Sequence, residues 1–493
     1  MQDIIATLNN LVWSNALVAV CLGAGLIFSI MTRFVQVRMF REMIRLIFAS
    51  KESDAGISSF QALAVSLSGR VGTGNIAGVA AAIGFGGPGA VFWMWVIALL
   101  GSATAYVEST LGQIYKEVDE GQYRGGPAYY IEKALGQKWY AWLFALTTII
   151  ACGFLLPGVQ SNAIANATEV AFGGNEIVDT FAGPMPIAKL ITGLAVTAVL
   201  GIIIFGGVKR IAHVTQIVVP FMALTYIVLA LGIIIANIGE LPRVIGLIVT
   251  DAFTPMAGFG AAIGWGVKRG IYSNEAGQGT GPHAASASEV DHPAQQGLVQ
   301  AFSVYIDTLF VCSATAFMIL ITGAYNVHPE GAEPIVMNLP IDTIIASPTF
   351  TQLALESVVG NAGKMFVAIA LFFFAFTTLL AYYYIAETNV AYIRRSFRFP
   401  GELIILKLVL MTTVFYGTVR TADVAWSMGD LGVGFMAWLN IVAILIIFLI
   451  AKPAIIALRD YEAQRNAGVT KYTFDPEKLG IKNADFWKRR LDD

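Results

Sequence analysis

Nine stretches of about 20 predominantly apolar residues run through this chain, and they restrict its fold more than any other feature. Hydrophobic residues make up 56% of the sequence and charged residues only 13%, about half of the charge in a soluble domain. Because water tolerates no arrangement of so much apolar surface, we expect an all-α, polytopic membrane protein. The nine stretches are Leu11–Met31, Ala90–Leu111, Tyr140–Val159, Ile187–Phe205, Ile211–Ile235, Leu298–Ile321, Met365–Ile385, Leu403–Thr418 and Leu431–Ile450.

Two further stretches, Phe60–Phe85 and Ala257–Ser286, are long enough to cross a bilayer but are rich in Gly, Ser, Thr and Asn. If both are counted and the N-terminus lies outside, 23 of the 31 Lys and Arg residues fall on the cytoplasmic side. The positive-inside rule requires such an asymmetry. We therefore predict about eleven spans in the cell inner (plasma) membrane, with the N-terminus outside and the C-terminus in the cytoplasm.

The order of the spans predicts an internal repeat. Once the first span is set aside, each polar stretch opens a group of five spans, and an odd number of spans inverts the second group relative to the first. Interrupted helices at matching positions of inverted repeats are typical of a transporter's binding site. The predicted divisions are 1–57 for the extra helix and its connector, 58–237 and 238–457 for the repeats, and 458–493 for a cytoplasmic tail. We expect this tail to be a solvated amphipathic helix with a loose end.

The first interrupted helix is expected to break between Ser66 and Asn75, where three glycines lie close together. Each glycine costs a helix about 1 kcal/mol relative to alanine. A break leaves backbone N–H groups that attract a carboxylate and carbonyl groups that suit a small cation such as Na⁺. Close helix packing is the alternative explanation. Phosphate binding is not indicated, because no Gly-Lys-Ser/Thr sequence follows and no strand precedes.

The second interrupted helix is expected to break between Gly264 and Gly281. Gly264 and Gly266 flank Trp265, whose indole could cover a small pocket. Three charged residues are expected in the half that approaches the cytoplasm: Lys268, Arg269 and Glu275. Because a charge inside a span is costly, we interpret them as a gate or a brace in preference to direct substrate contacts.

Other polar residues within the spans leave two interpretations open. The hydroxyls of Thr377 and Thr378 either bond to carbonyls one turn back or ligate a cation. Gln160, shortly after Pro157, is either a pocket amide or a helix cap.

Glu108 and Asp307 are isolated acids within spans. They either relay a proton or a cation, or pair with Arg70 or Lys268. The sequence contains no cluster of His and Cys typical of a metal site, and its pI near 6.1 provides no basic field for nucleic acid.

Three stretches resemble the signatures of one transporter family: Gly72–Ala80, Gly86–Gly101 with its Phe-Trp-Met-Trp core, and Tyr272–Gly277. On these residues the chain is identified as a member of the alanine/glycine:cation symporter family, also called sodium:alanine symporters. The resemblance covers roughly residues 10–460. It implies a leucine-transporter-like fold, in which an inverted repeat of five helices carries one extra N-terminal helix.

The resemblance also implies where the ligands bind. The substrate carboxylate would bind at Thr73, Gly74 and Asn75. The amino group and the small side chain would be enclosed by Gln160, Gly264, Trp265 and Gly266. Na⁺ would take carbonyls near Ser68 and Val71 and the hydroxyls of Thr377 and Thr378.

The implied function is secondary active symport, in which inward Na⁺ flow drives the import of alanine or glycine by alternating access. The sequence does not decide between alanine and glycine or between the L and D enantiomers, and it does not give the Na⁺ stoichiometry. Na⁺ is expected as the coupling ion, and no cofactor is expected. The chain is expected to lie in the lipid bilayer and to need no obligate protein partner. One alternative is a proton-coupled carrier of the same fold. A remote alternative is a membrane-embedded enzyme, for which the sequence shows no nucleophile–base arrangement and no catalytic residues.

Overall fold

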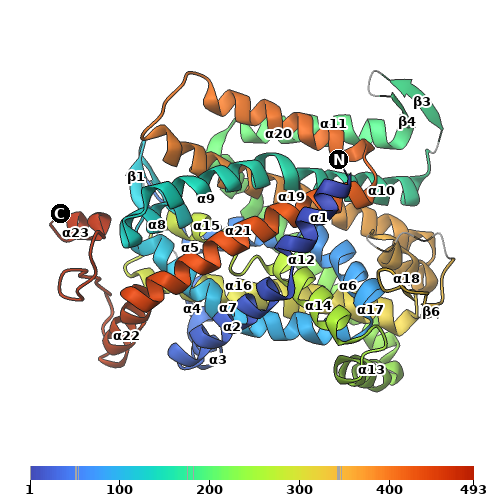
Figure 1. Cartoon of the computed structure of the whole chain (residues 1–493), viewed down its shortest axis with the longest axis horizontal. Helices are drawn as coiled ribbons and strands as arrows, with labels where there is room; N and C mark the ends of the chain where they lie inside the picture. The colour runs from blue at the N-terminus through green and yellow to red at the C-terminus, as the bar shows by residue number, and fades with distance from the viewer. Residues whose placement is uncertain are drawn as a thin grey trace.

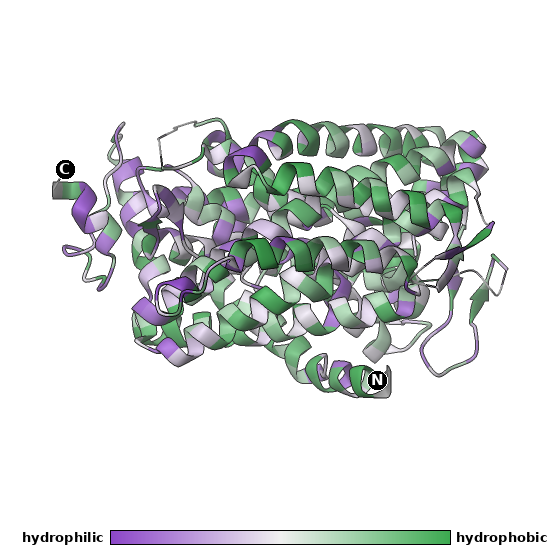
Figure 2. Ribbon diagram, turned by 90° about the horizontal axis from the view of Figure 1, so that it is seen from above, coloured by the Kyte–Doolittle hydropathy of each residue, from purple (hydrophilic) through white to green (hydrophobic). Residues whose placement is uncertain are grey.

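The computed structural model describes residues 2–49, 53, 55–174, 176–180, 183–340, 343, 345 and 347–492. Long helices run side by side along the longest axis of the molecule, and short hairpins lie at its ends (Figure 1). Hydrophobic residues dominate the middle, and hydrophilic residues gather toward the two ends (Figure 2). Within the described residues, nine helical segments are long and apolar enough to cross a membrane. They coincide one for one with the nine predicted stretches, whereas the full count of eleven stays a prediction.

The N-terminal span consists of two helices, α1 (Gln2–Val12) and α2 (Asn15–Met31), with a turn between them. The sequence predicted a single helix here. Two short helices, α3 (Val35–Arg38) and α4 (Phe40–Ile47), lead from this span to the repeats.

The first repeat begins with the interrupted segment of α5 (Ser59–Arg70), the π-helical turn η1 (Gly74–Gly78) and α6 (Val79–Gly86). The remaining elements are α7 (Gly89–Ile114), β1 (Glu117–Asp119), β2 (Gln122–Arg124), α8 (Pro127–Leu135), α9 (Lys138–Ile150), η2 (Ala151–Leu155), α10 (Leu156–Phe172), β3 (Ile177–Thr180), β4 (Gly183–Pro186), α11 (Ile187–Ile204) and α12 (Gly207–Ala236). This half contains two antiparallel hairpins. Strands β1 and β2 pair with Glu117 opposite Arg124, and strands β3 and β4 pair with Ile177 opposite Pro186.

The second repeat has its own interrupted segment, formed by α14 (Phe259–Asn274) and α15 (Gly281–Ala287). The other elements are η3 (Ile238–Glu240), α13 (Leu241–Phe253), α16 (Pro293–Val304), η4 (Tyr305–Cys312), α17 (Ser313–Thr322), β5 (Asn326–Val327), β6 (Val336–Met337), α18 (Thr349–Val359), α19 (Asn361–Arg394), α20 (Glu402–Val419) and α21 (Ala422–Ile450).

The arrangement of the two halves shows the predicted inversion. A short helix precedes the third span of each half, α8 in the first and α18 in the second. These two helices lie at opposite ends of the molecule (Figure 1). Equivalent elements of an inverted repeat are expected at opposite ends, so the fold is the inverted-repeat architecture that the sequence predicted.

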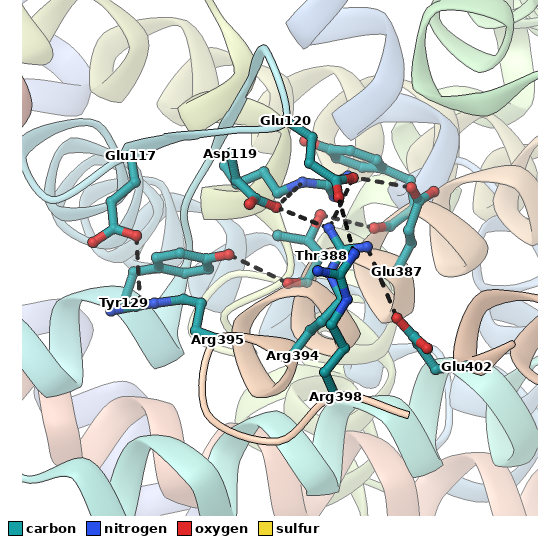
Figure 3. Close-up of polar contacts among 12 residues, drawn as sticks. Glu117, Asp119, Glu120, Tyr129, Glu387, Thr388, Arg394, Arg395, Arg398 and Glu402 are labelled. Carbon is teal, nitrogen blue, oxygen red and sulfur yellow. Dashed lines mark hydrogen bonds and ion pairs between the residues drawn. The ribbon is translucent and has the colours of Figure 1, made fainter. Parts of the chain in front are cut away.

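Ion pairs fasten the first hairpin to the end of α19 (Figure 3). Arg394 contacts Glu120 at 2.8 Å, and Arg124 contacts Glu387 at 3.3 Å. Arg394 and Arg124 belong to the basic residues that set the predicted orientation of the chain. In the structure they also hold α19 against the neighbouring loop.

The tail differs from the prediction of a loose end. Helix α22 (Pro453–Asn466) runs across the predicted division at 457, and a last helix, α23 (Asp485–Asp492), follows. Phe474 and Trp487 are 1% and 2% exposed, so the tail is packed against the rest of the chain. The correction has a physical reason: these aromatic side chains lose contact with water by docking.

Candidate functional site

The first interruption leaves backbone N–H groups without helical partners, and side-chain amide oxygens accept hydrogen bonds from them. Helix α5 ends at Arg70 and η1 begins at Gly74. Gly72 N–H donates to Asn75 Oδ1 at 2.8 Å. Thr73 donates to Gln160 Oε1 twice, from its N–H at 3.1 Å and from its hydroxyl at 2.8 Å. The structure thus brings together three predicted site residues, Thr73, Asn75 and Gln160, at the break.

Helix α19 lies directly against this break. A Cβ atom on Gly72 would lie 2.4 Å from Thr378 Oγ1 and 3.1 Å from Gln160 Oε1. Only glycine fits here, because real side-chain atoms do not approach so closely. Helix α19 and Gln160 therefore pack closely against the break at Gly72.

The two threonines of α19 point in different directions. Both hydroxyls donate to backbone carbonyls one turn back, Thr377 to Phe373 and Thr378 to Phe374, each at 3.0 Å. A hydroxyl that donates still has lone pairs for a cation. Thr378 faces Gly72, whereas Thr377 Oγ1 lies 3.9 Å from the Met222 sulfur on α12.

The other two predicted Na⁺ residues belong to the end of α5. The Ser68 hydroxyl donates to the Val65 carbonyl at 2.7 Å, so it is engaged within its own helix. Val71 is fully buried and leaves the helical conformation with ψ 88°. Its carbonyl lies outside the regular hydrogen-bonding pattern of α5, as a cation ligand requires.

The second interruption lies within the predicted stretch Gly264–Gly281, in its C-terminal part. Helix α14 continues through the glycines near its start as far as Asn274, and α15 begins at Gly281. Gly266 does not break the helix but allows close packing, because a Cβ there would lie 2.5 Å from the Ala90 carbonyl oxygen. The break instead uses Gly277 and Gly279, whose φ angles are +88° and +82°. Only glycine adopts such angles without strain.

At the second break, the carboxylate of Glu108 accepts hydrogen bonds from the freed backbone N–H groups. It accepts hydrogen bonds from Gly277 N–H at 3.3 Å and Gly279 N–H at 3.2 Å. The Asn440 side chain donates to the same carboxylate at 2.8 Å and to the Gly277 carbonyl at 2.9 Å. Successive N–H groups around a carboxylate form a backbone nest, and Glu108 supplies the acceptor oxygens of this one.

Asp307 on η4 connects the two interrupted segments. Asn75 Nδ2 donates to Asp307 Oδ1 at 2.6 Å, and the Ser273 hydroxyl donates to the same oxygen at 3.0 Å. The Thr308 hydroxyl donates to Asp307 Oδ2 at 2.7 Å. The Cys312 sulfur lies 3.3 Å from Asn75 Nδ2. This junction combines a carboxylate with several neutral oxygens, a ligand set for a small hard cation or a proton.

The sequence prediction missed three members of this junction: Ser273, Thr308 and Cys312. Ser273 precedes Glu275 by two residues, so a break placed after Asn274 would have identified it. Thr308 and Cys312 are brought there by the wider winding of the π-helix η4, which often marks a functional site but leaves no signal in the sequence.

Arg70 is buried at the end of α5 and is bound by α16. Its guanidinium donates to the Gln300 carbonyl at 3.0 Å and to the Ser303 hydroxyl. Three carboxylates lie within electrostatic reach: Glu275, Glu108 and Asp307. Glu275 itself accepts from the Thr280 hydroxyl at 2.8 Å. The predicted partners thus surround Arg70, while its hydrogen bonds go to α16.

Lys268 and Arg269 form a clamp before the second break. Both bind Asp430 of α21, Lys268 at 2.7 Å and Arg269 through two contacts of 2.8 and 2.9 Å. The Trp426 ring lies 4.3 Å from the Arg269 guanidinium. These two cations lie on the α14 side of the break. With the N-terminus outside, this is the outer half, whereas the sequence analysis expected them in the half that approaches the cytoplasm.

This clamp lies at a cavity of about 690 Å³. Its lining includes Gly264, Trp265, Lys268 and Asp430. The Trp265 ring stacks on the Phe85 ring, with 4.6 Å between the ring centroids. Gly264 and Trp265 therefore belong to this cavity, and their contacts are separate from those of the first break.

Comparison with known proteins identifies the family. Residues 1–476 match the sodium:alanine symporter family. The chain belongs to this family. YrbD of Bacillus subtilis (strain 168) is 59% identical, over 99% of this chain and 98% of its own. The sodium/proton-dependent alanine carrier protein of Bacillus sp. (strain PS3) is 51% identical, over 90% of this chain and 97% of its own. This member of the sodium:alanine symporter family is therefore a transporter in a multi-pass membrane fold and not an enzyme.

A solved structure supports the fold of this symporter. The crystal structure of MhsT in complex with L-phenylalanine matches with a TM-score of 0.55 at 16% identity, covering 83% of this chain and 99% of that one. MhsT has the leucine-transporter fold. The predicted fold class is thereby confirmed.

Proposed function

We propose that this chain couples inward Na⁺ flow to the import of a small neutral amino acid, alanine or glycine, by alternating access. One observation carries the proposal. The first break presents N–H groups held by neutral amide oxygens of Asn75 and Gln160, which a substrate carboxylate can displace. A carboxylate forms stronger hydrogen bonds with N–H groups than a neutral amide does.

The substrate carboxylate would bind the N–H groups of the first break, with Thr73, Gly74 and Asn75 as its contacts. Gln160 would then turn its carbonyl oxygen to the substrate ammonium. The close approach of Thr378 to Gly72 leaves little room, which favours the small side chain of alanine or glycine. The carrier protein of Bacillus sp. (strain PS3) is named for alanine, in agreement with this assignment.

Na⁺ would bind among the carbonyls of Ser68 and Val71 and the hydroxyl of Thr378. Thr377 would contribute less, because it faces Met222. A potential of about 100 mV, inside negative, supplies about 2.3 kcal/mol for each charge that moves inward. This free energy supports roughly fifty-fold accumulation for each charge.

A proton is the second candidate for the coupling ion. The name of the Bacillus sp. (strain PS3) relative includes both sodium and proton. Asp307 joins both interrupted segments through hydrogen bonds, so a change in its charge acts on both at once. We propose Asp307 as the residue at which a proton, or a further cation, would bind.

The remaining predicted residues would act around this site. Gly264 and Trp265 would guide the substrate at the cavity of the clamp, and Gly266 would act through packing on Ala90. In the orientation proposed from charge, with the N-terminus outside and the C-terminus in the cytoplasm, this cavity opens outward. Lys268, Arg269 and Asp430 would then form the outer gate.

Uptake of radiolabelled alanine into proteoliposomes tests the function. An inward Na⁺ gradient is compared with matched choline and with a pH gradient, and glycine and D-alanine are added as competitors. Accumulation above equilibrium that requires Na⁺ supports the proposal. Accumulation that follows the pH gradient alone moves the coupling to protons, and absence of alanine and glycine uptake under every gradient refutes the substrate.

A further inference from the structure

The inner ends of the two interrupted segments are joined to each other. Ile57 directly precedes Ser58, the N-cap of α5, and Ser288 directly follows α15. The two residues form a parallel bridge, in which Ile57 N–H donates to the Ala287 carbonyl at 2.9 Å and Glu289 N–H donates to the Ile57 carbonyl at 2.8 Å. Alternating access requires the inner halves of both segments to part, so this bridge lies where the inner mouth must open.

The C-terminal helix is attached to the same bridge. Arg490 contacts the Glu289 carboxylate at 2.6 Å, and Tyr123 donates to that carboxylate at 2.6 Å. Burial alone would raise the pKa of Glu289, but the hydrogen bond from Tyr123 and two neighbouring cations outweigh burial and lower the pKa below its usual value. The carboxylate is therefore ionised at cytoplasmic pH, and the ion pair with Arg490 is formed.

A second set of contacts runs through the end of α7. The Trp487 indole donates to the Gln113 carbonyl at 2.8 Å, and the Gln113 side chain donates to the Ser288 carbonyl at 3.0 Å. Lys116 donates to the same carbonyl at 2.9 Å. Its ammonium lies 4.1 Å from the Tyr123 ring and 4.5 Å from the Phe486 ring. The tail thus completes an aromatic enclosure around a buried lysine that holds the bridge.

We propose that the C-terminal segment 474–492 is a latch that keeps the inner mouth closed. Its release from Glu289 and Gln113 frees the bridge, and the inner halves of α5 and α15 separate. The tail is continuous with α22 and α21, so the latch also ties the bridge to the helix that carries Asp430 of the clamp. The inference rests on the proposed function in one respect: alternating access is the reason why the inner mouth must open.

A reporter cysteine at Ser66 measures this opening. Ser66 lies on α5 and lines a small cavity between α5, α15 and α19. Its buried hydroxyl has no hydrogen-bond partner among the described residues, so Ser66→Cys loses no hydrogen bond. Inside-out vesicles that contain the full chain are treated with a charged, membrane-impermeant methanethiosulfonate, and the labelling rate is compared with a parent without the reporter. The parent corrects for the buried native thiols Cys21, Cys152 and Cys312.

The decisive pair of variants differs by one position on the same helix. We expect Arg490→Ala to raise the labelling rate of the reporter about fivefold, which corresponds to about 1 kcal/mol. Arg489→Ala removes the same charge from an exposed neighbour and is expected to leave the rate unchanged. Exchange of the charges in Glu289→Arg with Arg490→Glu should return the labelling rate toward that of the Ser66→Cys protein with an intact latch.

Trp487→Ala is expected to raise the rate more, because it removes both the indole hydrogen bond and part of the enclosure of Lys116. If this variant does not fold, Arg490→Ala alone decides. Unchanged labelling in Arg490→Ala overturns the latch, and so does equal acceleration in Arg489→Ala. Labelling needs neither substrate nor Na⁺, so failure of the latch is distinguishable from failure of alanine uptake.

Discussion

The two interrupted helices satisfy their exposed backbone N–H groups in opposite ways. At the first break the acceptors are neutral amide oxygens of Asn75 and Gln160. At the second break the acceptor is the Glu108 carboxylate. A charge-assisted hydrogen bond is about twice as strong as a neutral one. The N–H groups of the first break can therefore exchange their acceptors for a substrate carboxylate. Those of the second break keep the Glu108 carboxylate as a permanent structural partner.

Gln160→Glu removes this difference and is expected to have the largest effect. A carboxylate would then occupy the first break permanently and repel the substrate carboxylate. We expect the KM for alanine to rise about a hundredfold, or about 2.7 kcal/mol, in proteoliposome uptake. Gln137→Glu, at an exposed position, is the matched control and should transport normally. A KM within threefold of the parent would contradict the proposed carboxylate site.

Glu108→Gln weakens the brace at the second break. Hydrogen bonds to a charged group contribute about 1.5–3 kcal/mol, so thermal stability in detergent should fall. We expect the maximal uptake rate to drop about tenfold while KM changes less than twofold, because the substrate binds elsewhere. Glu176→Gln, at an exposed loop position, serves as the control. A change confined to KM would instead place Glu108 in the substrate site.

Gly72→Ala narrows the first break. The added Cβ would lie 2.4 Å from Thr378 Oγ1, so α19 must shift away. We expect the KM for alanine to rise about tenfold, or about 1.4 kcal/mol, with glycine affected less than alanine. Gly232→Ala introduces the same methyl group where no heavy atom lies within 4 Å. Equal kinetics for both variants would show that the pocket is not at Gly72.

The two threonines of α19 provide the smallest expected effect. Thr378→Ala removes a hydroxyl that faces the break and should raise the Na⁺ concentration for half-maximal uptake about fivefold, or about 1 kcal/mol. Thr377→Ala removes one that faces Met222 and should change it less than twofold. The measurement is uptake against Na⁺ concentration at saturating alanine. A larger effect at Thr377 would reverse the assignment.

The sequence predicted the long spans well because each is an apolar run whose length matches a bilayer. It also located the first break, where glycines and polar residues coincide with the actual turn. The second break was predicted over a wider stretch than the structure uses, because a glycine that permits close packing looks the same in sequence as one that interrupts a helix. Gly266 packs on Ala90, while Gly277 and Gly279 adopt positive φ.

The junction at Asp307 and the docked tail were beyond the reach of sequence reasoning for another reason. Asn75 and Asp307 are 232 residues apart, and Trp487 and Gln113 are 374 apart. No periodicity links such pairs, because their contact depends on the completed packing of the bundle. Asp307 was singled out as a candidate by its charge alone, whereas its partners Ser273, Thr308 and Cys312 carry no charge.

Helix α1 has partners that are synthesised much later. Asn9 donates to the Ser427 carbonyl at 2.7 Å and Trp13 to the Asp430 carbonyl at 2.8 Å, across 418 and 417 residues of chain. At a translation rate of about 5–20 residues per second, α21 emerges roughly 20 to 80 seconds after α1. Throughout that interval the insertion machinery or the lipid must accommodate α1 without these bonds. The N-terminal helix of this chain therefore reaches its final packing only after the last span has been synthesised.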